Sequence, residues 1–164
     1  MDCILQSWNA RRAVNYGGKL TAVDQIILIK SDPMTHSEFE FSSRNDGISF
    51  SATMRDNQDC CRFMDISYSH PNRWTSLVLP MTDEQEDRAY ARAAKLNGMG
   101  YDLIGLGSFG TKWDIIKPHP DKLWCSEACA ELIKAAYGYG DDFVPHFYSP
   151  TSLYFEMVHR LAKK

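Results

Sequence analysis

A cysteine at the predicted start of a helix is the residue best placed to do chemistry. It lies in the stretch Trp124-Cys125-Ser126-Glu127, in the first turn of a helix predicted near residues 123–137. Backbone N–H groups in a first turn lack helical partners and carry partial positive charge, which favours a thiolate over a thiol. A thiolate attacks carbonyl carbons, and the same N–H groups can hold the oxyanion that forms. The predicted chemistry is acyl transfer through a cysteine nucleophile.

The same predicted helix has an apolar face, because small or apolar residues recur at helical spacing: Cys125, Cys129, Leu132, Ile133 and Ala136. The nucleophile candidate therefore lies at the end of a core-facing stripe. A free cysteine in such a place is often a small buried hydrophobe without a chemical role, which is the alternative interpretation. Cys129 lies one turn further into the helix, away from the partial positive charge of the first turn, and is predicted to belong to the core.

A histidine at the start of a predicted strand supplies the base that a cysteine nucleophile needs. Residues 35–41 alternate in polarity, so His36 and Glu38 share one face of the strand. Glu38 can accept a hydrogen bond from the second ring nitrogen and fix the tautomer. Ser51, on the next predicted strand, is the alternative orienting group. The competing interpretation is that His36 and Glu38 form a solvated outer face of a half-exposed strand.

Predicted strands come first along the chain and predicted helices come second. The strands are predicted over residues 22–30, 35–41, 48–54 and 74–79, with a hairpin turn at 44–47, whereas residues 1–18 are ambiguous between helix and strand. The helices are predicted over residues 82–97, 123–137 and from Ser149 onward. This segregation predicts an α+β domain in which helices pack on an antiparallel sheet.

Length and composition limit the classes of function. The 164 residues suit a single domain, and 44% hydrophobic residues can build a core. A net charge of −3 without a basic run makes nucleic acid an unexpected partner. No apolar run is long enough to cross a bilayer, and no secretory signal opens the chain. The odd count of 5 cysteines predicts reduced thiols in a cytoplasmic compartment.

Metal ligation is the other common use of cysteine and histidine. The adjacent Cys60 and Cys61 do not have the spacing of a zinc site, and no histidine pair accompanies Cys125 and Cys129. The Gly105-x-Gly107 sequence lacks the preceding strand and the Lys-Ser/Thr of a phosphate-binding loop. No metal and no cofactor are therefore predicted.

Several stretches, in this order, resemble one family. They are Asp24-Gln25-Ile26-Ile27-Leu28, Thr35-His36-Ser37-Glu38-Phe39, Gly47-Ile48-Ser49-Phe50-Ser51 with Arg55-Asp56, Trp74 to Pro80, Gly100-Tyr101-Asp102-Leu103-Ile104-Gly105-Leu106, Trp124 to Ala130, and Ser149-Pro150-Thr151-Ser152-Leu153. The chain resembles the circularly permuted NlpC-type branch of the papain-like superfamily. That group includes YiiX-like proteins and is related to lecithin retinol acyltransferase.

The resemblance implies a permuted papain-like fold, an antiparallel sheet or small barrel packed against helices, with its core over about residues 20–161 of one domain. It implies Cys125 as nucleophile and His36 as base. Several relatives carry a second histidine where this chain has Ser51, so the third catalytic group is open between Glu38 and Ser51. Trp124 and Tyr101 are candidate substrate contacts, with packing as their alternative role.

The resemblance also ranks the activities. A peptidase or amidase that acts on peptide or peptidoglycan-type substrates comes first, because NlpC-type relatives act on such amides. A lipid acyltransferase or thioesterase comes second. The third interpretation is a binding module that keeps the cleft but in which Cys125 and His36 are not catalytic. The presence of Ser51 in place of a second histidine favours it. The sequence does not fix the oligomeric state.

Overall fold

A seven-stranded sheet runs through the part of the chain that the computed structural model describes, residues 2–17, 19–41, 44, 47–54, 59–68, 72–105 and 119–163. The strand order is β5-β1-β2-β3-β4-β6-β7. The strands are β1 (Asp2–Asn9), β2 (Met34–Glu40), β3 (Ser49–Thr53), β4 (Cys60–Met64), β5 (Trp74–Pro80), β6 (Gly100–Tyr101) and β7 (Lys122–Leu123). Neighbours pair antiparallel except for β6 and β7, which makes the sheet mixed.

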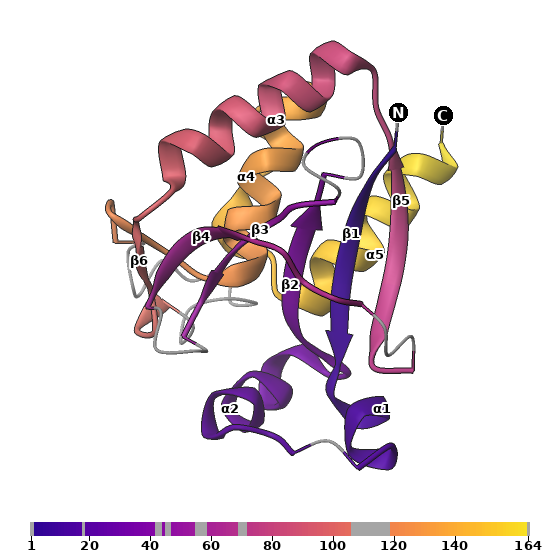
Figure 1. The fold of residues 1–164 in the computed structure, drawn as a ribbon, viewed down its shortest axis with the longest axis vertical. Coiled ribbons are helices and arrows are strands. Elements are labelled where there is room, and N and C mark those ends of the chain that lie inside the picture. The colour runs from indigo at the N-terminus through magenta and orange to yellow at the C-terminus, as the bar shows by residue number, and fades with distance from the viewer. Residues whose placement is uncertain are drawn as a thin grey trace.

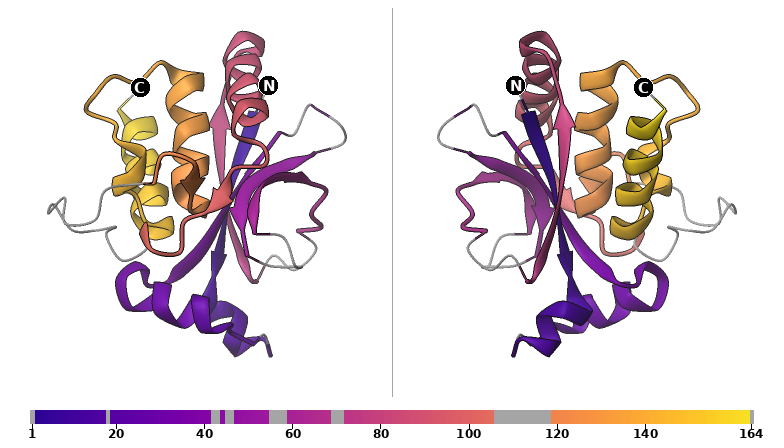
Figure 2. Two further views of the ribbon diagram at one scale, coloured as in Figure 1. Left: turned by 90° about the vertical axis from the view of Figure 1, so that its left-hand side faces the viewer. Right: turned by 90° about the vertical axis from the view of Figure 1, so that its right-hand side faces the viewer.

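Five α-helices accompany the sheet in the described residues: α1 (Ala10–Asn15), α2 (Ala22–Ser31), α3 (Asp83–Leu96), α4 (Cys125–Tyr137) and α5 (Pro150–Ala162), with a 3-10 turn at η2 (Pro145–Phe147). Figure 1 shows α4 and α5 behind the sheet, with α1 and α2 at the end of the molecule away from α3. In Figure 2, α4 and α5 lie side by side on one face of the sheet. Most strands precede most helices, so the predicted α+β class is confirmed.

The strand predicted over residues 22–30 is wrong, because those residues form the helix α2. Thr21 caps this helix and Asp24 closes a capping box with it, each side chain accepting the other residue's backbone N–H. The run of isoleucine and leucine favours a strand by composition, but the capping box satisfies backbone groups that only a helix leaves open. The stretch from Asp24 to Leu28 named in the resemblance therefore lies in a helix and not in a strand.

Other expected elements are confirmed with small shifts of their ends. Thr82 and Gln85 form the predicted capping box of α3, and Ser149 caps α5 ahead of Pro150. Gly138 ends α4 with a φ of 67°, in the left-handed region that favours glycine. The segment that was ambiguous in the sequence divides into β1 and α1. The sequence did not predict the strand β4, because its five residues show no clear alternation of polar and apolar side chains.

The core lies between the apolar face of the sheet and α4. The strands β1, β2, β3 and β5 each supply a large buried side chain, namely Leu5, Phe39, Phe50 and Leu79 in that order. From the helix, Leu132 and Ile133 are fully buried against them, as the stripe of apolar residues in the sequence predicted. This packing fixes the axis of α4, and therefore the position of its first turn. No helix among the described residues has the length and apolar character to cross a membrane.

We expect Leu132→Ala to lower the free energy of unfolding by about 2–5 kcal/mol, because the fully buried side chain leaves a cavity that α4 cannot close. Leu103→Ala is the matched control, because Leu103 is 46% exposed. Its effect should stay within about 0.5 kcal/mol. Urea unfolding of the two variants measures both values, and equal losses would contradict the core described here.

Candidate active site

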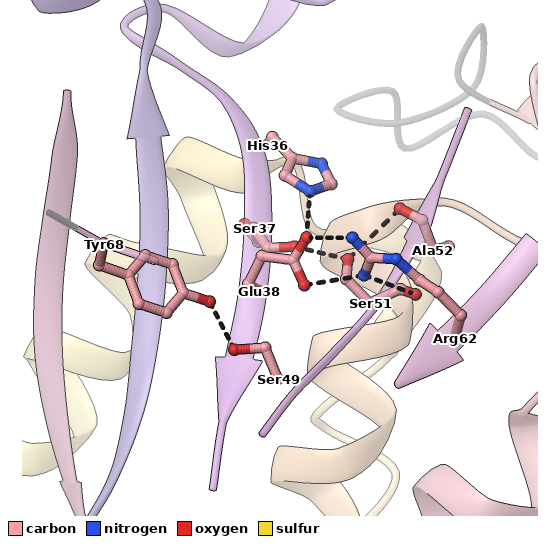
Figure 3. Close-up of polar contacts among 8 residues, drawn as sticks. All are labelled: His36, Ser37, Glu38, Ser49, Ser51, Ala52, Arg62 and Tyr68. Carbon is pink, nitrogen blue, oxygen red and sulfur yellow. Dashed lines mark hydrogen bonds and ion pairs between the residues drawn. The ribbon is translucent and has the colours of Figure 1, made fainter. Parts of the chain in front are cut away.

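The His36 imidazole is held by a carboxylate on its own strand. Nε2 of His36 lies 2.7 Å from Oε1 of Glu38, two residues further along β2 (Figure 3). Side chains two apart on a strand point to the same face, so the alternation of β2 places the pair together. His36 is 6% exposed and Glu38 only 1% exposed. The interpretation of this strand face as a solvated one is therefore wrong.

Arg62 on β4 completes a buried ion pair that the sequence did not reveal. Its Nη1 and Nη2 donate to Oε2 and Oε1 of Glu38 at 3.0 Å each, a bidentate contact (Figure 3). The only signal in the sequence is an arginine between Cys61 and Phe63, inside an otherwise apolar strand. A buried cation needs a partner, and that partner came from a distant strand. Glu38 therefore joins Arg62 to His36.

The charges in this group shift two pKa values in opposite directions. Burial would raise the pKa of Glu38, but hydrogen bonds and charge from His36 and Arg62 lower it below its usual value. Burial would likewise lower the pKa of His36, but the charge and hydrogen bond of Cys125, together with those of Glu38, raise it to about 9. An ionised Glu38 therefore faces a protonated His36 near neutral pH.

Cys125 meets the other side of the same imidazole. It is the first residue of α4, and it lies close enough to His36 for its charge and hydrogen bonding to raise the pKa of the imidazole. Because Nε2 of His36 is engaged by Glu38, Nδ1 is the ring nitrogen left for the sulfur. The preceding residue, Trp124, has no side-chain oxygen to cap the helix, so the first-turn N–H groups receive no side-chain cap from it. Thiol, imidazole and carboxylate thus form one hydrogen-bonded series.

The sheet opens beside this series and lets α4 approach. The ladder between β2 and β3 joins Phe39 to Phe50 and Glu40 to Ser49 and goes no further toward His36. Near the gap, the Ser51 hydroxyl donates to the Ser37 carbonyl at 2.6 Å in place of a backbone bond. The helix α4 packs against both β2 and β3. The gap therefore brings the first turn of a core helix to the polar face of β2.

Ser51, the alternative third group, is engaged in other contacts. Besides the Ser37 carbonyl, it hydrogen-bonds with Cys129 one turn into α4. Burial, followed by the nearby charges of Glu38 and Cys125, raises the pKa of the Cys129 thiol well above its usual value. Cys129 is thus a buried neutral thiol, in keeping with its predicted place in the core. The geometry favours Glu38 over Ser51 as the group that orients His36.

A neutral carboxyl group lies two residues after Cys125. Glu127 is 4% exposed, and its Oε2 has no hydrogen-bond partner in the structure. Burial raises its pKa to about 8, although a hydrogen bond from the Trp124 backbone opposes the shift. An ionised Glu127 would repel a thiolate in the same helical turn. The raised pKa removes this repulsion near neutral pH.

Two pockets adjoin His36. One, of about 130 Å³, lies between α2 and a wall that includes Tyr101 and Met54. The other, of about 270 Å³, is bordered by Glu38 and Arg62 and by Trp74, whose ring centroid is 6.4 Å from that of His36. Cys125 itself is fully buried. The sulfur is therefore closed to solvent, and a bound molecule would reach it only after neighbouring side chains move aside.

The remaining predicted residues lie at different distances from the site. Tyr101 lines the smaller pocket together with His36, so it is placed to touch a bound group. Trp124 is fully buried, and its Nε1 donates to the Tyr148 carbonyl at 3.3 Å, which favours a packing role. Asp102 accepts a hydrogen bond from the Gly105 backbone and shapes a turn. The segment Arg55-Asp56 named in the resemblance lies outside the described residues.

Among the described residues, no group of three or more histidine, cysteine or acidic side chains is arranged to hold a metal ion. Comparison with protein-family models, with curated proteins and with solved structures finds no significant match to this chain.

We expect Arg62→Met to lower the free energy of unfolding by about 3–5 kcal/mol, because it leaves the buried Glu38 carboxylate without its cation. Arg62→Lys should recover part of the loss, since it keeps the charge but not the bidentate fork. Urea unfolding of both variants and of the Arg62→Met, Glu38→Gln double variant measures these effects. A double variant no more stable than Arg62→Met alone would contradict the ion pair.

The raised pKa of Glu127 predicts that Glu127→Gln increases the free energy of unfolding by an amount that depends on pH. The unfolded chain ionises this group near its ordinary pKa of about 4.3, whereas the folded chain keeps it protonated up to about pH 8, so wild-type stability falls across that window. Glutamine does not ionise. The advantage of Glu127→Gln in unfolding free energy should therefore grow between about pH 5 and about pH 8, by up to roughly 1.4 kcal/mol per pH unit. A pH-independent difference would refute the neutral carboxyl.

Proposed function

We propose that this chain is a cysteine hydrolase that cleaves an amide or ester bond through an acyl-enzyme. The hydrogen-bonded series from Cys125 through His36 to Glu38 carries the proposal. A nucleophile beside a base that a third group orients is the arrangement that covalent acyl transfer requires. The resemblance to NlpC-type proteins ranks peptide and peptidoglycan-type amides before lipid acyl groups as substrates.

In the first half-reaction, the Cys125 thiolate attacks the carbonyl carbon and a carbon–sulfur bond forms. Negative charge moves to the carbonyl oxygen, and the N–H groups of the α4 first turn, which no side chain of Trp124 caps, can donate hydrogen bonds to it. Nδ1 of the His36 imidazolium then donates its proton to the departing amine or alcohol. The carbon–nitrogen or carbon–oxygen bond breaks, and the acyl group remains on sulfur as a thioester.

In the second half-reaction, water takes the place of the leaving group. Neutral His36 accepts a proton from the water as its oxygen attacks the thioester carbon. The carbon–sulfur bond breaks, the carboxylic acid departs, and the thiolate–imidazolium pair is restored. Throughout both halves Glu38 holds Nε2, so the ring keeps one tautomer and one orientation, and Arg62 keeps Glu38 ionised.

The contacts of Glu38 and Arg62 argue against the alternative of a binding module without catalytic activity. That alternative was favoured because the chain has Ser51 where several relatives have a second histidine, which left the third catalytic group unassigned. Glu38 occupies the orienting role through a 2.7 Å contact, so the base has a carboxylate partner without a second histidine. Burying Arg62 with Glu38 has a desolvation cost, and apolar residues in their place are often at least as stable. A cleft that only binds a ligand would not require this ion pair.

We expect the Cys125 thiol to react with iodoacetamide at about pH 6, because the thiolate is the reactive form, although its burial slows the reaction relative to an exposed thiolate. His36→Ala should slow this labelling about tenfold or more, since it removes the cation that pairs with the sulfur. Mass spectrometry of the labelled peptide, with Cys125→Ala as the blank, gives the rate at this one site.

His159→Ala is the matched control, because His159 is an exposed histidine on α5. It should leave the labelling rate unchanged. Cleavage of amide and ester panels should fall about 10²-fold or more in His36→Ala and vanish in Cys125→Ala. Labelling that is equally fast with and without His36, together with cleavage that survives Cys125→Ala, would exclude the proposed function.

A further inference from the structure

The smaller pocket beside His36 has a defined boundary. Val23 and Ile27 of α2 form one wall, Tyr101 and Met54 another, and His36 closes it on the side of β2. Its volume is about 130 Å³. A protein cavity of roughly 150 Å³ holds a benzene molecule, so this pocket fits a group of about four to six carbon atoms.

The pocket adjoins the imidazole, whereas the fully buried Cys125 lies behind its lining and is not part of it. Tyr101 on β6 pairs with Leu123 on β7, and Leu123 lies only two residues before Cys125. Cys125 in turn hydrogen-bonds with His36 on the opposite wall. The lining therefore includes His36, one member of the reactive pair, and a residue paired with the strand that leads into Cys125. A group bound there lies beside the imidazole.

The lining is apolar apart from hydroxyl groups, one engaged carboxylate and the His36 imidazole. Asp24 is 3% exposed, and its oxygens accept hydrogen bonds from the Thr21 and Thr35 hydroxyls at 2.8 and 2.9 Å. No lysine or arginine is among the described residues that line the pocket. The one cation among the described lining residues is the His36 imidazolium, which Glu38 and Cys125 already engage, so a carboxylate in the bound group would be buried near Asp24 without a free cation. Burial of an unpaired charge is unfavourable, so the pocket excludes anionic groups.

The larger pocket on the other side of His36 has a different character. Glu38, Arg62 and Asp65 border it, and Trp74 covers one side. Such a surface suits a polar leaving group that takes up a proton from His36. The two sides of the imidazole therefore differ in size and in their charged residues, and we refer to the pocket bordered by Glu38, Arg62 and Asp65 as the polar pocket.

We propose that the pocket between α2 and Tyr101 binds the acyl side of the substrate and selects a short, uncharged aliphatic group. This inference rests on the proposed hydrolase function and adds its substrate class. The acyl group stays in this pocket when it is bonded to the Cys125 sulfur, and the leaving group departs through the polar pocket. The helix α2 is then the element that determines specificity.

Nitrophenyl esters of acetate, butyrate and succinate test the assignment. Butyrate fills the pocket, acetate leaves it mostly empty, and the hemisuccinate has the butyrate chain length with a carboxylate in place of the terminal methyl group. The wild-type kcat/KM should be about tenfold or more higher for butyrate than for acetate or hemisuccinate, because two methylene groups in an apolar site discriminate to that extent. A preference for hemisuccinate over butyrate would overturn the assignment.

Val23→Phe fills the pocket, and Ile29→Phe is its matched control, since Ile29 is on the same helix but 84% exposed. We expect Val23→Phe to lower kcat/KM for butyrate about tenfold while acetate changes less than about threefold. Retained acetate hydrolysis and Cys125 labelling show that the variant is folded. An unchanged butyrate-to-acetate ratio in a folded Val23→Phe variant would overturn the proposal.

A second pair of variants distinguishes the two pockets. Met54→Ala enlarges the acyl pocket and should extend the preferred chain by one or two carbons, whereas Met64→Ala enlarges the polar pocket and should not. The opposite pattern would place the acyl group on the other side of His36 and overturn this inference while leaving the hydrolase intact. Ester hydrolysis that persists in Cys125→Ala would instead overturn the hydrolase, and this inference with it.

Discussion

The carboxylate of Glu38 is the group on which the arrangement of the site depends. It is almost fully buried, and a buried charge is tolerated only when it is paired and hydrogen-bonded. Arg62 supplies the pairing through two 3.0 Å contacts, and His36 takes a third contact at 2.7 Å. Because all three side chains come from β2 and β4 of one sheet, their positions follow from strand register and leave little freedom to the imidazole.

The sheet meets the helix where its regular pairing stops. Along most of its length β2 pairs with β1, yet its ladder with β3 joins only two residue pairs. The Ser51 hydroxyl satisfies the Ser37 carbonyl at the gap, so the opening does not leave that acceptor unpaired. The buried stripe of α4 anchors the helix on the apolar face, and its first turn carries Cys125 to His36. A core helix and a polar strand face thus meet at one point.

Much of this arrangement could be predicted from the sequence, and the exceptions have physical causes. The alternation of β2 placed His36 and Glu38 together, and helical spacing identified the stripe of α4, because both signals are local. The partner of Glu38 was not predictable in this way, since Arg62 lies 24 residues away and its role depends on register. The helix α2 was mistaken for a strand because its apolar run outweighed the Thr21 and Asp24 capping signal.

The protonation of one ring tests the central claim most directly. An NMR titration of the His36 imidazole should give a pKa near 9 in the wild-type chain, well above the ordinary value of about 6.5. The value should fall in Cys125→Ala, because the sulfur contributes charge and a hydrogen bond to the imidazolium. A His36 pKa near the ordinary value, unchanged by the loss of Cys125, would contradict the pairing of the two side chains and the chemistry built on it.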